Sequence, residues 1–147
     1  DPERLRIPLS EGVTVIAAHA AGNGSNSGER NFDRFLRLAA LFPNLYADIS
    51  ARYAETAVTP RFAGQFLTRH QDRLVYGTDM GFDPDMYRTT FRILETLDEH
   101  FYAPIFGYHW SYSGFGLASP VLEKVYRTNA QRVAKAAAAT ARPAAGR

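Results

Sequence analysis

Two kinds of segment alternate along the chain, and they differ in how their hydrophobic and polar positions are arranged. Short apolar runs, rich in β-branched residues, cover Val13 to His19, Leu45 to Ser50 and Arg73 to Thr78. Such runs are typical of strands buried on both faces, as in a parallel sheet. Between them, 31–42 and the segment that starts at Thr59-Pro60 carry apolar residues at helical spacing. This alternation predicts an α/β fold with three βα units, parallel strands and right-handed crossovers.

The remaining segments predict two helices and several loops. Asp83 and Pro84 supply an N-cap and a first helical residue for a helix running to about Leu97. A second helix starts at Ser119-Pro120, with Asn129 marking a break before its last stretch. We also predict a Gly/Ser/Asn loop at 22–28, an ordered aromatic loop at 99–117, one domain portion over 1–137 and a disordered Ala/Pro/Arg tail at 138–147.

Each predicted strand ends in a polar residue, His19, Ser50 or Asp79. The carboxyl ends of adjacent parallel strands share one edge of the sheet, where α/β folds place their chemistry. We therefore expect His19 and Asp79 to share a site. A buried structural histidine is the alternative for His19. A capping role is the alternative for Asp79, although Asp83 already fills that position.

Five other polar residues have weaker interpretations. Asp48 lies inside its strand and is expected to accept structural hydrogen bonds. Arg52 is a candidate for binding a substrate carboxylate, with a plain surface role as the alternative. His109, in the aromatic loop, is a candidate for lining a substrate pocket. His70 and His100 are expected at helix ends, in structural roles.

Composition narrows the function classes. The 147 residues are 46% hydrophobic and contain no cysteine, which excludes a disulfide scaffold, a thiolate metal site and a cysteine nucleophile. The net charge of +2 and the scattered C-terminal cations favour a solvated helix face over a nucleic-acid site. No apolar run reaches a membrane span and no leader is recognised, so we expect a cytoplasmic protein without nucleic-acid or membrane partners. Phosphate-loop, dinucleotide-binding and serine-hydrolase motifs are absent from the sequence.

Four stretches carry a family resemblance: 13–22 (VTVIAAHAAG), 44–52 (NLYADISAR), 72–81 (DRLVYGTDMG) and 121–133 (VLEKVYRTNAQRV). In order and spacing the chain resembles the C-terminal portion of amidohydrolase-superfamily proteins. It is similar to the amidohydrolase-related branch that includes aminocarboxymuconate-semialdehyde decarboxylase and gamma-resorcylate decarboxylase. The resemblance covers most of the chain, and its motifs are more specific together than singly.

The resemblance implies a (β/α)8 TIM barrel with these strands as its sixth, seventh and eighth. A whole barrel needs about 250 residues, so the barrel here is expected to be incomplete. By the resemblance, Asp79 matches a ligand of a divalent metal, Zn2+ or alternatively Mn2+, and His19 matches a histidine that assists the reacting water or substrate. The family's His-x-His pair and fifth-strand histidine have no counterpart in this sequence.

The implied activity is hydrolysis of C–N or C–O bonds, or decarboxylation, of a small molecule such as a carboxylate. We expect the isolated chain to be inactive, because a catalytic zinc needs about three protein ligands. A homo-oligomeric parent protein is compatible with the resemblance. The alternative is an inactive fragment or a non-catalytic α/β module that binds through the aromatic loop. Cut out of a barrel, the sheet would have two open edges and self-associate through four strand residues: Val15, Ile16, Leu74 and Val75.

Overall fold

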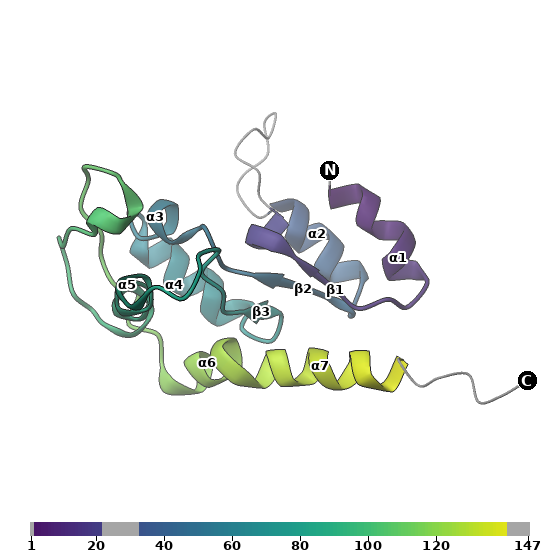
Figure 1. Ribbon diagram of the computed structural model, residues 1–147. Coiled ribbons are helices and arrows are strands. Elements are labelled where there is room, and N and C mark those ends of the chain that lie inside the picture. Colours follow the sequence, from purple (N-terminus) through teal and green to yellow (C-terminus); the bar gives the residue numbers. More distant parts are fainter. Residues whose placement is uncertain (1, 22–32, 141–147) are drawn as a thin grey trace, which may run out of the picture.

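The computed structural model describes residues 2–21 and 33–140, and shows three parallel strands in one open sheet (Figure 1). The strands are β1 (Val15–Ala17), β2 (Leu45–Asp48) and β3 (Leu74–Val75), in the order β1-β2-β3. The predicted α/β class and strand order are confirmed, and the open sheet is consistent with part of a TIM barrel. The strands are shorter than predicted, because the chain leaves the sheet before each predicted end.

Helices connect and flank these strands. They are the short turns η1 (Pro2–Leu5), η2 (Ala18–Ala21) and η3 (Pro104–Phe106), the π-helical turn η4 (Lys124–Thr128), and the α-helices α1 (Arg6–Ser10), α2 (Asp33–Leu41), α3 (Tyr53–Thr56), α4 (Pro60–Arg69), α5 (Pro84–Glu95), α6 (Ser119–Glu123) and α7 (Asn129–Thr140). The start of α5 follows the predicted cap, since the Asp83 carboxylate accepts the N–H groups of Asp85 and Met86 at 2.8 and 3.1 Å. The short helix α3 was not predicted.

The core lies where the sheet meets the helices. Side chains without solvent exposure come from α2, β2, β3, α5, the aromatic loop and η4: Phe35, Leu38, Leu45, Ala47, Leu74, Ile93, Leu94, Tyr112 and Val125. The aromatic loop is ordered as predicted. Phe101 and Tyr112 form an antiparallel bridge across it. Burial of these apolar side chains supplies the main stabilisation of the fold.

The C-terminal helix is continuous through α6, η4 and α7, and Figure 1 shows it running along the β3 side of the sheet. The predicted break at Asn129 is therefore wrong. Asn129 is fully buried, and its Nδ2 donates to the carbonyls of Gln71 and Leu74 at 2.6 and 2.8 Å. Polar residues with low helix propensity stay inside a helix when tertiary hydrogen bonds of this kind replace local ones.

The π-helical turn gives a second link between this helix and β3. The Asn129 N–H donates to the Lys124 carbonyl, five residues back, instead of to Val125. The Val125 carbonyl thereby loses its usual α-helical donor. It accepts the N–H of Tyr76 instead, at 2.9 Å.

The two edges of the sheet consequently differ. At β3, Leu74 and Val75 are buried and the outward main-chain groups of Leu74 and Tyr76 bind the C-terminal helix, so the predicted open edge there is wrong. At β1, Val15 donates to the Asn44 carbonyl beside β2. Because a parallel ladder alternates sides, the main-chain groups of Ile16 point away from β2. Ile16 is 45% exposed to solvent.

Other predictions fall partly outside the described residues. The loop at 22–28 and the start of the helix predicted at 31–42 lie outside them, and so does the tail from residue 141. Within the described part, α7 continues to Thr140, past the predicted start of a disordered tail at residue 138. None of the helices in the described ranges has the length and apolar character needed to cross a membrane.

Candidate functional site

The side chains of His19 and Asp79 meet at the carboxyl edge of the sheet. His19 follows β1, Asp79 follows β3, and the distance from His19 Nε2 to Asp79 Oδ2 is 3.5 Å. The prediction that both lie on one rim is confirmed, although β2 separates their strands. The two side chains are 33% and 55% exposed, so a small molecule can reach them.

The backbone turns sharply where each strand ends. His19, Ala51 and Asp79 have positive φ angles of 56°, 54° and 61°, and so does Ala20 at 53°. Residues with a Cβ rarely adopt this left-handed conformation, which costs on the order of 1–3 kcal/mol and occurs often at functional sites. The strained residues therefore lie at the strand ends, which set the positions of His19 and Asp79.

Asp48 holds the turns that follow β1 and β2. Its Oδ1 accepts the backbone N–H of His19 at 3.1 Å and that of Ser50 at 3.0 Å, together with the Ser50 hydroxyl. The prediction that Asp48 accepts structural hydrogen bonds is confirmed. By accepting the His19 N–H, the Asp48 carboxylate also helps to fix the backbone of the candidate site.

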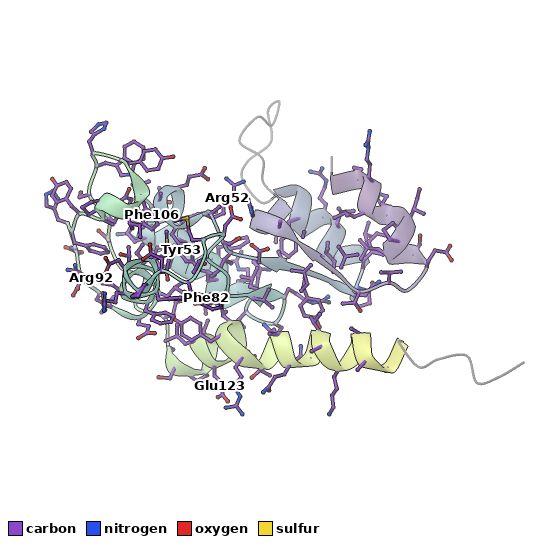
Figure 2. All side chains as sticks on the ribbon, viewed as in Figure 1. Arg52, Tyr53, Phe82, Arg92, Phe106 and Glu123 are labelled. Carbon is purple, nitrogen blue, oxygen red and sulfur yellow. The ribbon has the colours of Figure 1, made fainter. Side chains whose placement is uncertain are left out.

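Arg52 lies inside the site instead of on the surface. Its side chain is 11% exposed, its Nε donates to the His19 carbonyl at 3.1 Å, and its Nη1 pairs with Glu55 at 2.8 Å. Figure 2 shows Arg52 between the sheet and the region of Tyr53 and Phe106. The predicted contact of Arg52 with a substrate carboxylate stays a prediction.

Tyr53 is a site residue that the sequence analysis missed. Its ring is buried, and its hydroxyl donates to the Gly77 carbonyl at 2.8 Å, two residues before Asp79. Burial raises the pKa of Tyr53 well above its ordinary value, so the hydroxyl remains a donor at all physiological pH values. A Cβ at Gly77 would lie 3.3 Å from Ser50 Cβ, so a side chain there would require Ser50 to shift by a few tenths of an ångström. The only sequence signal for this contact is the aromatic residue directly after Arg52.

A cleft of about 210 Å3 opens beside Asp79. Two carboxylates and a set of larger apolar and aromatic side chains line it: Glu55, Asp79, Met80, Met86, Phe106 and Tyr108. The predicted lining residue His109 is instead exposed, and its ring packs against Trp110 with centroids 5.5 Å apart. The aromatic loop reaches the cleft through Phe106 and Tyr108, the residue before His109.

Neither of the other two histidines lies at this site. His70 caps the end of α4, as predicted, and its ring packs on Phe66 with centroids 4.9 Å apart. Burial, followed by the charge of Arg69, lowers the pKa of His70, so the neutral form is favoured over a cation at the helix end. His100 is not at a helix end, because α5 stops at Glu95. That prediction is wrong, and His100 instead occupies a left-handed turn with φ 53°.

His19 and Asp79 do not make a complete metal site. Over residues 2–21 and 33–140, no group of three or more histidine, cysteine, aspartate or glutamate side chains is placed to hold an ion. A catalytic zinc takes about three protein ligands. The carboxylate and the imidazole are suitable ligands for such an ion, but two ligands are fewer than a catalytic zinc site needs.

The open parallel α/β sheet, with polar residues at its strand exits, is consistent with part of a TIM barrel. The protein-family model described as Amidohydrolase matches residues 8–134, and the chain belongs to this amidohydrolase family. No curated protein and no solved structure matches the chain. The family is enzymatic and typically metal-dependent.

Proposed function

We propose that the chain supplies the carboxyl-terminal strands and the acid–base pair of a metal-dependent hydrolase or decarboxylase acting on a small molecule. The observation that carries the proposal is the pairing of His19 with Asp79, 3.5 Å apart on the carboxyl rim, in a chain of the amidohydrolase family. The similarity to the decarboxylase branch supports the finer choice of a carboxylate substrate. Hydrolysis of C–N or C–O bonds is the other reaction class.

Proton transfer is the chemistry that these two residues can perform. The Asp79 carboxylate can accept a proton from a reacting group, and the His19 imidazole can donate a hydrogen bond or a proton to the charge that develops. A separation of 3.5 Å is long for a hydrogen bond, but catalytic contacts often shorten once substrate is bound. The adjoining cleft offers apolar walls for the body of the substrate.

The proposed metal, zinc or manganese, would bind at Asp79 with ligands that the described residues do not provide. When bound, such an ion polarises a carbonyl and lowers the pKa of water. We therefore expect the isolated chain to show no appreciable turnover. Tight, stoichiometric zinc binding by this chain in calorimetry, together with ester hydrolysis, would contradict the proposal that its ligand set is incomplete.

The role of Asp79 is tested in the parent protein, in which further strands would complete the barrel around this chain. Turnover is measured as p-nitrophenyl acetate hydrolysis and as CO2 release from aryl carboxylates, with Zn2+ or Mn2+ added. Asp79→Asn should abolish turnover because the amide lacks both charge and basicity, whereas His19→Ala should lower kcat and largely keep the bound metal. Asp85→Asn is the matched control, because Asp85 is an exposed partner of Arg88 on α5. Unchanged turnover in Asp79→Asn would refute the assignment.

One observation favours the alternative of a binding module. Tyr108 and Trp110 stack with centroids 4.3 Å apart and an interplanar angle of 15°, and both remain well exposed on the aromatic loop. Stacked, exposed aromatic rings are typical of ligand-binding surfaces. A completed barrel without turnover, whose Trp110 fluorescence still reports saturable binding of an aryl carboxylate, would favour this alternative.

A further inference from the structure

We infer that Arg52 is a positioning residue. By donating a hydrogen bond to the backbone carbonyl of His19, in the strained turn after β1, it keeps the His19 side chain next to Asp79. The inference rests on the proposed function, because it concerns the same pair of side chains. It differs from a substrate-binding role, in which the guanidinium would point at a ligand instead of at a carbonyl of the protein.

Both polar backbone groups of His19 form hydrogen bonds with side chains. Its N–H donates to Asp48 Oδ1 at 3.1 Å, and its carbonyl accepts from Arg52 Nε at 3.1 Å. His19 has φ 56° and ψ 36°, a conformation that a residue with a Cβ keeps only when its surroundings enforce it. Asp48 and Arg52 both come from the β2 exit, so that segment enforces the turn after β1.

Arg52 is itself fixed in place. Its Nη1 pairs with Glu55 three residues later, on α3, and its side chain is 11% exposed. A guanidinium is planar and carries donors in a rigid fork, so one anchored edge sets the direction of the others. The pairing with Glu55 therefore directs Nε toward the His19 carbonyl.

The same segment fixes the other half of the pair. Tyr53 follows Arg52 in the chain, and its hydroxyl donates to the Gly77 carbonyl at 2.8 Å, just before Asp79. The turn at 48–53 thus contacts the exits of β1 and β3 at once. Because β2 lies between those strands, this turn sets the distance between the His19 imidazole and the Asp79 carboxylate.

Histidine ring signals in NMR spectra test the inference. The chain contains four histidines, so 13C labelling at histidine Cε1 yields four signals, of which His70, His100 and His109 serve as internal references. Asp79→Asn shows where the His19 signal lies when the pairing is lost. At the same pH, Arg52→Gln should move the His19 signal toward that position and leave the other three unchanged. Arg61→Gln, an exposed arginine on α4, is the matched control and should move none.

An unchanged His19 signal in a folded Arg52→Gln variant would overturn the inference. If Arg52→Gln unfolds, which would collapse all four signals, Glu55→Gln replaces it. That variant keeps the guanidinium but removes its anchor, so the His19 signal should move in the same direction by a smaller amount, and no movement would again overturn the inference. The readout is a chemical shift and not turnover. Loss of activity in Asp79→Asn without a shift in Arg52→Gln would therefore reject the positioning role and leave the proposed function standing.

Discussion

Replacing Asn129 by aspartate tests how the C-terminal helix is attached to the sheet. The two side chains have the same shape, but a carboxylate has no donor for the carbonyls of Gln71 and Leu74, which accept from Nδ2 at 2.6 and 2.8 Å. An acceptor left unsatisfied in the core costs about 1–3 kcal/mol, and a partly buried bond contributes about 0.5–1.5 kcal/mol. The lost bonds therefore account for about 1.5–4.5 kcal/mol.

The charge introduced at residue 129 sets the total loss, in which the lost bonds are already included. Position 129 is fully buried, and an uncompensated charge in the interior destabilises by about 3–5 kcal/mol. Burial and the facing carbonyls should raise the folded-state pKa of the new carboxyl above its unfolded value of about 3.9. A raised pKa means that the folded state binds the proton more tightly, so stability falls as the pH rises through about 3.9 toward the folded pKa. The protonated carboxyl also regains one donor, so the loss should be smallest in acid.

Urea unfolding followed by far-UV circular dichroism measures the effect. Asn129→Asp should lose about 3–5 kcal/mol at neutral pH and markedly less near pH 4. Gln131→Glu makes the same chemical change on the exposed face of α7. Its free energy of unfolding should stay within about 0.5 kcal/mol of that of the unsubstituted chain. If the two variants lose equal stability at neutral pH, the attachment attributed to Asn129 is refuted.

Two further predictions concern association and pH. The unsubstituted chain should scatter light as an associating species at micromolar concentration, and Ile16→Lys should reduce the scattering, because it places a charge on the open β1 edge. A chain that scatters light as a monomer would contradict this. The lowered pKa of His70 makes the unfolded state bind more protons, so stability should fall modestly as the pH drops below about 6.5. Thermal melts at pH 7.5 and 5.5 should show a smaller difference in His70→Gln than in the parent, and equal differences would exclude His70 as the cause.

The apolar runs were sufficient to predict the order and direction of the strands. The placement of His19 and Asp79 followed from the same pattern, because parallel strands bring their carboxyl ends together whatever the details of the turns. The strand lengths were overestimated, since β1 ends at Ala17 and β3 at Val75, before the left-handed turns at His19 and Asp79. Any residue other than glycine adopts this conformation uncommonly, so the sequence pattern does not locate such turns, even though aspartate and histidine adopt it more often than most residues.

Contacts between distant segments account for most of the other differences. Asn129 resembled a helix break because its low helix propensity is a local property, whereas its bonds to Gln71 and Leu74 span more than 50 residues. Tyr53 was indicated locally only as an aromatic residue after Arg52, since its partner, the Gly77 carbonyl, lies 24 residues away in the chain. His109 was chosen from a loop without periodicity. There the sequence does not specify which side chain faces the cleft, and Tyr108 does so instead.

The π-helical turn and the Asn129 side chain together leave β1 as the one edge, within the described residues, at which a further strand could pair. The Val125 carbonyl and the Asn129 amide already serve the outward groups of β3, as an added strand would. Within the described part of the chain, an extended peptide that binds by strand addition can therefore find its hydrogen bonds only beside Ile16 on β1. A fluorescent peptide with apolar residues at every second position would act as a reporter for that edge alone. It would bind without displacing the C-terminal helix.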